Sequence, residues 1–343
     1  MSLADSIPIR FGHILERGIN SLFYCWVREV TDKGEIFRIE DPGKYWIISW
    51  DEYRYTEFSK ARLVKPKGFN TVSLRSRSVF RYGVFQLNAK LPKWGDGPML
   101  WFGFEAEDLF GGGVVHFMLR NDRLHAFSGA WGGDLLKLTL PNLPEDYYLK
   151  RHVYSIYVHE TLALWFIDNR LSGLAVLANT NRPHVIHEGP PYSIGITSMK
   201  PSTTLGVLMD IDGGSVDKEW VWDDIHPWQI RVLNGDPKPS LVLELYRMNS
   251  SELLKGEVRK RRIMSHPLPA LGLRTTFLFK SRSSGRLIIQ AYTLNGSWEA
   301  LDEVMVQGNE LTSYTLEGAL LVRLLYEPRD IPTKVEIADA IIS

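Results

Sequence analysis

Strand-like alternation of apolar and polar residues dominates the chain. In residues 81–105, RYGVFQLNAKLPKWGDGPMLWFGFE, the apolar side chains of Phe85 and Leu87 alternate with Gln86 and Asn88. This period of two is typical of a half-buried strand, with one face in a core and the other free to meet a ligand. Apolar runs separated by Gly, Pro, Asn and Asp turns continue throughout, while long segments with a 3.6-residue apolar period are nearly absent. We therefore predict an all-β protein.

A second clear strand follows at residues 114–120, VVHFMLR. Its alternation places His116 and Arg120 on one face and Phe117 and Leu119 on the other. The residues that we expect on the buried faces of this sheet and its partner are Phe85, Leu87, Phe102, Phe104, Phe117 and Leu119.

A break near residue 235 indicates two domains. Residues 234–237, NGDP, form a strong turn signal, and a fresh series of strand-like runs begins after it. We predict one domain over residues 1–235 and a smaller β-sandwich over residues 236–343.

The composition narrows the classes of partner. The chain has 343 residues, 44% of them hydrophobic, so it can bury a sizeable core. Lys plus Arg and Asp plus Glu both number 40, which argues against nucleic acid or an anionic membrane as a partner. Cys25 is the only cysteine, so no intramolecular disulfide can form. From the sequence as it stands we expect a soluble, cytoplasmic protein. If an export signal has already been removed from this sequence, we expect an extracellular protein instead.

Two segments resemble a known family. Residues 81–105 and residues 151–171, RHVYSIYVHETLALWFIDNRL, are similar to the glycoside hydrolase family 16 portion of the concanavalin A-like lectin and glucanase superfamily. The resemblance implies a concanavalin A-like jelly-roll sandwich for the first domain and does not cover the second.

The catalytic strand of that family has no counterpart here. Family members carry an E-x-D-x-x-E or E-x-D-x-E strand, whereas residues 114–120 contain no carboxylate and place His116 in the expected cleft. Hydrolysis of a glycosidic bond usually needs two carboxyl groups. We therefore expect a carbohydrate-binding protein on a glucanase-like scaffold, rather than an enzyme.

Two alternatives stay open. Glu105 and Glu107 would share a strand face with Trp101 at about 6.5 to 7 Å spacing, within the roughly 5 to 9.5 Å range of glycosidase carboxyl pairs. They would make the protein an endo-acting glycoside hydrolase. Alternatively, the β faces bind another protein, which would make the chain a structural or interaction protein.

The expected ligand is an oligo- or polysaccharide. Sugars offer flat C–H faces and directed hydroxyls, which suit tryptophans interleaved with polar groups. We predict that one concave face and the loops beside it supply the ligand-binding residues: Gln86, Asn88, Trp94, Trp101, His116, Arg120, His125 and Trp131.

We expect no cofactor and no metal. His184 and His187 have a His-x-x-His spacing without an obvious third ligand. Asp210 and Asp212, with Asp217 beyond, could supply oxygen ligands to a structural calcium ion, but an ordinary acidic turn is the simpler interpretation.

Overall fold

The computed structural model divides the chain into two compact units, residues 1–237 and 238–343. It describes residues 23–50, 58–80, 83–106, 113–130, 135–141, 143–158, 162–177, 182–190, 192–197, 205–232, 256–270, 274–293, 296–319 and 321–342. The predicted domain boundary after residue 235 lies outside these ranges. Within them the only helical element is a single 3-10 turn, η2 (Pro42–Lys44). None of the described segments forms a helix long and apolar enough to span a membrane.

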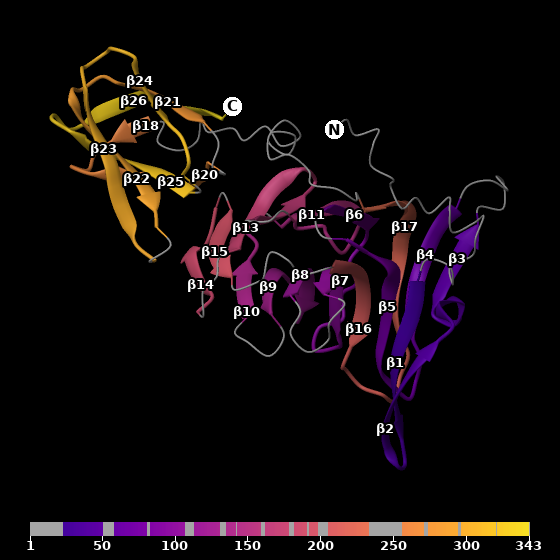
Figure 1. Ribbon diagram of the computed structural model, residues 1–343. Coiled ribbons are helices and arrows are strands. Elements are labelled where there is room, and N and C mark those ends of the chain that lie inside the picture. The colour runs from indigo at the N-terminus through magenta and orange to yellow at the C-terminus, as the bar shows by residue number, and fades with distance from the viewer. Residues whose placement is uncertain are drawn as a thin grey trace. The chain divides into compact units, whose positions relative to one another are not determined.

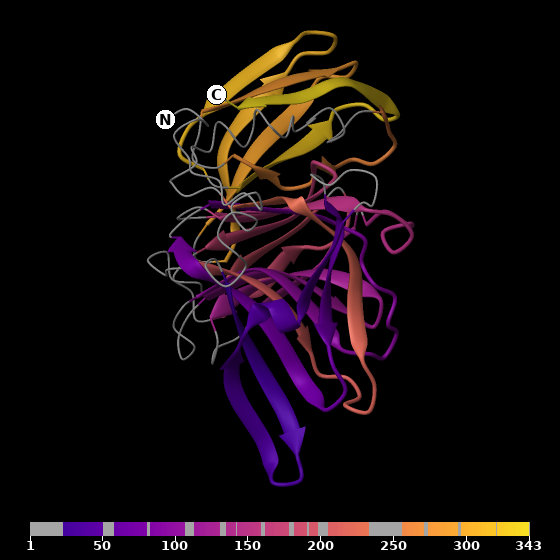
Figure 2. The same cartoon turned by 90° about the vertical axis from the view of Figure 1, so that its right-hand side faces the viewer.

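The described residues of the first unit form two β-sheets (Figures 1 and 2). The eight-stranded sheet has the spatial order β10 (Leu135–Thr139), β9 (Arg123–Ala130), β8 (Gly113–Arg120), β7 (Met99–Ala106), β16 (Leu205–Asp212), β5 (Phe69–Phe80), β1 (Phe23–Thr31) and β2 (Gly34–Glu40). The nine-stranded sheet has the order β14 (His184–His187), β15 (Ser193–Thr197), β13 (Arg170–Leu177), β12 (Leu162–Ile167), β11 (His152–Val158), β6 (Gly83–Ala89), β17 (Trp220–Val232), β4 (Phe58–Lys65) and β3 (Trp46–Trp50). The described pairs are antiparallel except for β13 and β15, which are parallel.

The core lies between these two sheets. The six residues predicted to be buried, namely Phe85, Leu87, Phe102, Phe104, Phe117 and Leu119, all belong to one cluster and are at most 2% exposed. Phe102 is at its centre, with ring centroids 5.1 Å from Phe117, 5.6 Å from Tyr154 and 5.4 Å from Trp222. Tyr154 and Trp222 come from the nine-stranded sheet, so these contacts join the two layers. The predicted all-β sandwich is confirmed.

The second unit is a smaller sandwich. One sheet contains β18 (Gly256–Val258), β26 (Thr333–Ile342), β21 (Thr275–Ser281) and β24 (Thr312–Leu316). The other contains β19 (Ile263–Met264), β25 (Leu321–Pro328), β22 (Gly285–Tyr292) and β23 (Trp298–Val306), and β20 (Leu268–Pro269) pairs with β25. Phe277 and Phe279 of the first sheet share a buried cluster with Leu287, Leu324 and Tyr326 of the second.

Gly103 allows β7 and β8 to approach closely. It has a φ of +146°, and a Cβ there would lie 2.5 Å from the Val115 carbonyl oxygen and 2.6 Å from Ile156 Cδ1. We expect Gly103→Ala to lower the free energy of unfolding by about 1–3 kcal/mol, because a side chain must displace backbone in a close-packed layer.

Chemical denaturation followed by tryptophan fluorescence measures this loss, because Trp298 is the only one of the 11 tryptophans after residue 237. Gly206→Ala on β16 is the matched control, since the nearest atom to its Cβ would be the Ser76 hydroxyl oxygen, at 3.3 Å, and the next two are backbone oxygens at 3.8 Å. Equal losses in the two variants would contradict the close-approach argument.

Candidate functional site

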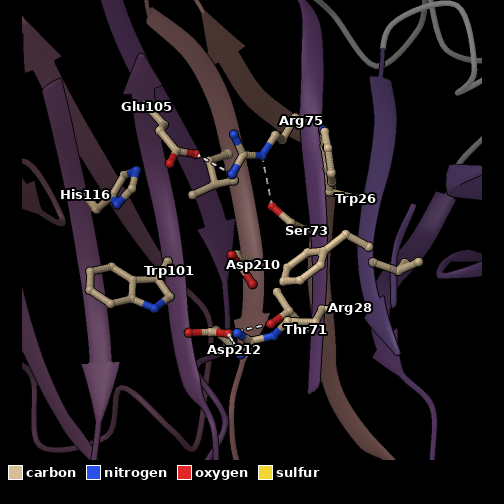
Figure 3. A pocket seen from close by; sticks show the side chains of 13 residues that line it. Trp26, Arg28, Thr71, Ser73, Arg75, Trp101, Glu105, His116, Asp210 and Asp212 are labelled. Carbon is tan, nitrogen blue, oxygen red and sulfur yellow. Dashed lines mark hydrogen bonds and ion pairs between the residues drawn. The ribbon is translucent and has the colours of Figure 1, made fainter. Parts of the chain in front are cut away.

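A cavity of about 320 Å³ opens on the outer face of the eight-stranded sheet (Figure 3). Strands β8, β7, β16, β5, β1 and β2 line it, so the residues come from both ends of the first unit's sequence. Three rows of cross-strand neighbours supply most of the lining. The rows are Trp101–Asp210–Ser73–Trp26, His116–Gly103–Leu208–Arg75 and Asp212–Thr71–Arg28–Phe37.

Arg75 connects two sides of the cavity. Its Nη2 lies 3.0 Å from Glu105 Oε2, and its Nε donates a hydrogen bond to Ser73 Oγ at 3.3 Å. Glu105 is only 6% exposed. A buried carboxylate is costly unless a cation compensates its charge, and the guanidinium of Arg75 provides that compensation.

Asp210 lies in the middle of the cavity floor, between Trp101 and Ser73 in register (Figure 3). Burial raises the pKa of its carboxyl well above the usual value, and the nearby negative charges of Asp212 and Glu105 act in the same direction. Its Oδ1 is buried and has no hydrogen-bond partner among the described residues. Asp210 therefore presents a carboxyl group that favours the protonated form, with one buried oxygen that no described residue hydrogen-bonds.

His116 forms part of the wall beside Trp101. Burial, and then the positive charge of Arg75, lower the pKa of the imidazole to about 3, so the ring is neutral at physiological pH. The centroids of the His116 and Trp101 rings are 5.7 Å apart in an edge-to-face arrangement. Both ring nitrogens are buried, and an interaction with the backbone of Phe104 opposes part of this lowering of the pKa.

A second set of paired charges lies at the end of the cavity formed by Arg28, Thr71 and Asp212. Arg28 Nη2 lies 3.5 Å from Asp212 Oδ1, which also accepts a hydrogen bond from Thr71 Oγ1 at 2.5 Å. Arg28 Nη1 lies 3.7 Å from Glu35 Oε2. The charges that line the cavity are thus largely compensated by one another, and the site carries no strong net field of either sign.

Aromatic surface is present at the rim as well as in the wall. Trp101 is 9% exposed, because it packs with Met118, Leu208 and Phe127 in a small outer cluster. Phe37 on β2 is 62% exposed, and Trp26 on β1 is half-buried. The aromatic faces accessible to a ligand are therefore those of Trp26 and Phe37 more than that of Trp101.

The structure brings together some of the predicted site residues. Trp101, Glu105 and His116 line the same cavity. His125 lies on the same outer face, opposite Met118, and Arg120 is exposed at the end of β8, but neither lines the cavity.

Gln86 and Asn88 are placed differently from the prediction. β6 belongs to the nine-stranded sheet, and its inward-facing residues pack in the core. Gln86 and Asn88 therefore point outward from the other sheet, where Gln86 Nε2 donates to Ser155 Oγ at 3.3 Å. The prediction that they share a face with Trp101 is wrong, because a period of two identifies the faces of one strand but not the sheet that the strand joins.

Trp94 also lies away from the cavity. It precedes β7 and packs against the core, with its ring centroid 5.8 Å from that of Trp220. The sequence predicts Trp94 on a loop beside the ligand site, but the structure does not place it among the residues that line this cavity. Glu107 and Trp131 lie outside the described residues.

The sequence reasoning missed the contributions of β1, β2, β5 and β16. In three short segments, two outward-facing residues flank one buried residue, and this pattern is the local signal of an outer face. The segments are Trp26–Arg28, Ser73–Arg75 and Asp210–Asp212. The interpretation of Asp210 and Asp212 as an acidic turn is wrong, since both lie in β16. Across the described ranges, no group of three or more His, Cys, Asp or Glu side chains could hold a metal ion.

Comparisons with known proteins give low similarity. No family model matches the sequence, and no curated protein matches it significantly. Among solved structures, a family 16 endo-glucanase from Bacteroides ovatus is 13% identical over 62% of this chain and 94% of its own, with a TM-score of 0.40. A β-glucanase from Bacillus licheniformis is 12% identical over 61% of this chain and 98% of its own, with a TM-score of 0.36.

A laminarinase catalytic domain from Thermotoga maritima is 15% identical over 62% of this chain and 98% of its own, with a TM-score of 0.35. These three neighbours are thus two glucanases, one of them of family 16, and a laminarinase catalytic domain. Because the identities and TM-scores are low, we carry no residue role over from them.

The neutral state of His116 can be measured directly. We expect the ring signals of His116 to stay constant between about pH 8 and pH 5, because burial lowers the pKa of this imidazole to about 3. The signals of an unperturbed imidazole would change near pH 6.5. Two-dimensional NMR of histidine-labelled protein, with His116→Asn to assign the signal, measures this.

Because the pKa of His116 is lower in the folded chain than in the unfolded chain, the unfolded chain binds the proton first as the pH falls. The contribution of His116 to the free energy of unfolding is therefore complete above about pH 6.5 and is lost between that pH and about pH 3. A titration midpoint above pH 5 would contradict the burial argument.

Proposed function

We propose that the cavity on the outer face of the eight-stranded sheet binds an oligo- or polysaccharide. The observation that carries the proposal is the combination in one cavity of accessible aromatic surface, from Trp26 and Phe37, with the carboxyl group of Asp210, one oxygen of which has no hydrogen-bond partner among the described residues. Sugar rings pack their C–H faces on aromatic rings and direct hydroxyl groups to fixed polar atoms.

The charge balance favours an uncharged saccharide. Arg75 pairs with Glu105, and Arg28 pairs with Asp212 and Glu35, so neither guanidinium is left to select an anion. The carboxyl group of Asp210 can exchange hydrogen bonds with hydroxyls, because a hydroxyl both donates and accepts, whereas His116 is fully buried and shapes the wall of the cavity. β-1,3-glucans and mixed-linkage glucans are uncharged, hydroxyl-rich polysaccharides of this kind and are the first ligands to test.

The binding proposal predicts a clear mutational pattern. Phe37→Ala and Trp26→Ala should each weaken glucan binding by about threefold to tenfold, because each removes an aromatic stacking surface. Calorimetric titration with glucan oligosaccharides measures the change, after a broad glycan array has selected the ligand.

Ile36→Ala is the matched control, because Ile36 is adjacent on β2, is also exposed and does not line the cavity. An array without any binding by folded protein would instead favour the alternative of a protein-interaction surface.

Glycoside hydrolysis is a second candidate function, favoured by two carboxyl groups in unlike environments. Asp210 is buried and favours its protonated form, which suits a general acid. Glu105, charge-compensated by Arg75 in the same cavity, would serve as the carboxylate that a glycosidase also needs. In this proposal Asp210 takes the place of Glu107 as the partner of Glu105.

Hydrolysis makes a prediction separate from binding. Asp210→Asn and Glu105→Gln should each reduce cleavage of a bound glucan by about 10²- to 10⁴-fold while the glucan still binds. Release of reducing ends measures the cleavage, and Asp217→Asn, an exposed residue outside the cavity, is the control. Binding by the wild-type protein without release of reducing ends would leave carbohydrate binding as the function.

A further inference from the structure

A second cavity lies on the smaller unit, on the outer face of the sheet formed by β19, β25, β22 and β23. Its volume is about 520 Å³. Ile288 and Leu325 form a buried apolar floor, and Met264 is exposed beside them. The polar groups around this floor are Arg262, Gln290, Glu303 and Arg323.

At one end of this face every charge is compensated. Glu327 accepts hydrogen bonds from Arg262 Nε at 2.6 Å and from Arg286 Nη2 at 2.6 Å. Arg286 Nη1 also donates to Glu303 Oε2 at 3.1 Å. These four side chains form one connected ion network, which leaves neither arginine free to select an anion.

Arg323, at the other end, differs from both of these arginines. Its guanidinium carbon lies 4.2 Å from the centroid of the Trp298 ring, and its Nε donates to Gln290 Oε1 at 2.8 Å. Among the described residues, no carboxylate forms an ion pair with it and none accepts a hydrogen bond from its Nη atoms. The stacking and the Nε hydrogen bond fix the plane of the guanidinium, so that the Nη pair is preorganised for a planar oxyanion.

The register separates Arg323 from the acidic end of the cavity. Arg323 pairs with Gln290, and Gln290 pairs with Ala300, while Glu303 belongs to the neighbouring row opposite Ile288. The guanidinium of Arg323 reaches across β22, because its carbon lies 4.2 Å from the ring of Trp298 on β23, the strand that also carries Glu303. The donor site at Arg323 and the acceptor site at Glu303 are therefore separated along the strands, and Ile288 and Leu325 lie in the row of Glu303.

We infer that this face of the smaller unit binds a carboxylate-bearing sugar of the uronic acid type. The carboxylate accepts hydrogen bonds from Arg323 Nη1 and Nη2, and one C–H face of the ring packs on Ile288 and Leu325. Hydroxyl groups on the far side donate to Glu303. The inference rests on the second unit alone and does not depend on the function proposed for the first.

Arginine side-chain NMR of the full chain tests this site. Sodium glucuronate should shift the Arg323 Nε–Hε signal saturably, with an affinity at least about tenfold higher than that of glucose, because a charge-assisted bidentate contact is lost with the neutral sugar. Arg323→Gln identifies the signal. Matched sodium chloride keeps the ionic strength constant, and acetate reports the carboxylate without the ring.

Variants then locate the binding. Binding to each variant is measured through the NMR signals of glucuronate. Arg323→Gln should weaken the affinity by about tenfold or more. The affinity of Arg323→Lys should lie between those of Arg323→Gln and the wild type, since lysine keeps the charge without the planar guanidinium. Arg274→Gln is the charge-matched control, because Arg274 is an exposed arginine of the same unit outside the cavity. It should bind as the wild type does.

Several outcomes would overturn the inference. They are equal affinity for glucose and glucuronate, unchanged affinity in folded Arg323→Gln, or no saturable shift in the folded wild-type protein. Acetate that binds as tightly as glucuronate would show a simple anion site and would overturn the assignment to a sugar.

Discussion

The packing of Phe102 between the two sheets of the first unit is the contact on which the candidate site depends. Its ring contacts Phe117 of the same sheet and both Tyr154 and Trp222 of the other. Because side chains alternate along a strand, burying Phe102 turns Trp101 to the outer face, and a slip of one residue would exchange them. The core packing thereby decides which residues of β7 can meet a ligand.

The composition of the outer cavity follows from the cost of burying polar groups. Glu105, Asp210 and His116 are all nearly inaccessible, so each needs a partner or a change of protonation state. Glu105 pairs with Arg75, burial favours the protonated form of Asp210, and His116 stays neutral. The result is a cavity with several hydrogen-bonding groups and little net charge, which suits an uncharged, hydroxyl-rich ligand.

In the smaller unit the charged side chains are also mostly paired, but one arginine has no acidic partner among the described residues. Most of the charges on the outer face of its five-stranded sheet are paired, but Arg323 is oriented by Trp298 and Gln290 without a carboxylate partner among the described residues. An oriented guanidinium of this kind selects for an oxyanion. The two units therefore offer surfaces of different charge preference, each set by which arginines have acidic neighbours across the strands.

The sequence by itself determined the strand pattern and the faces of single strands. Alternation correctly identified Phe85, Leu87, Phe102 and Phe117 as buried, because a sheet with one side in a core needs an apolar residue at every second position. It also placed Trp101, Glu105 and His116 on outward faces. These are properties of short segments, which the local pattern carries.

Only the tertiary structure decided which strands lie side by side. Alternation alone did not reveal that β6 joins the nine-stranded sheet, which takes Gln86 and Asn88 away from Trp101. It also gave no sign that β16 lies beside β7, because the two strands are about a hundred residues apart in sequence. This pairing brings Asp210 opposite Trp101. Strand order depends on long-range hydrogen bonding and on the fit of the two sheets across the core, and neither is encoded in the period of any single strand.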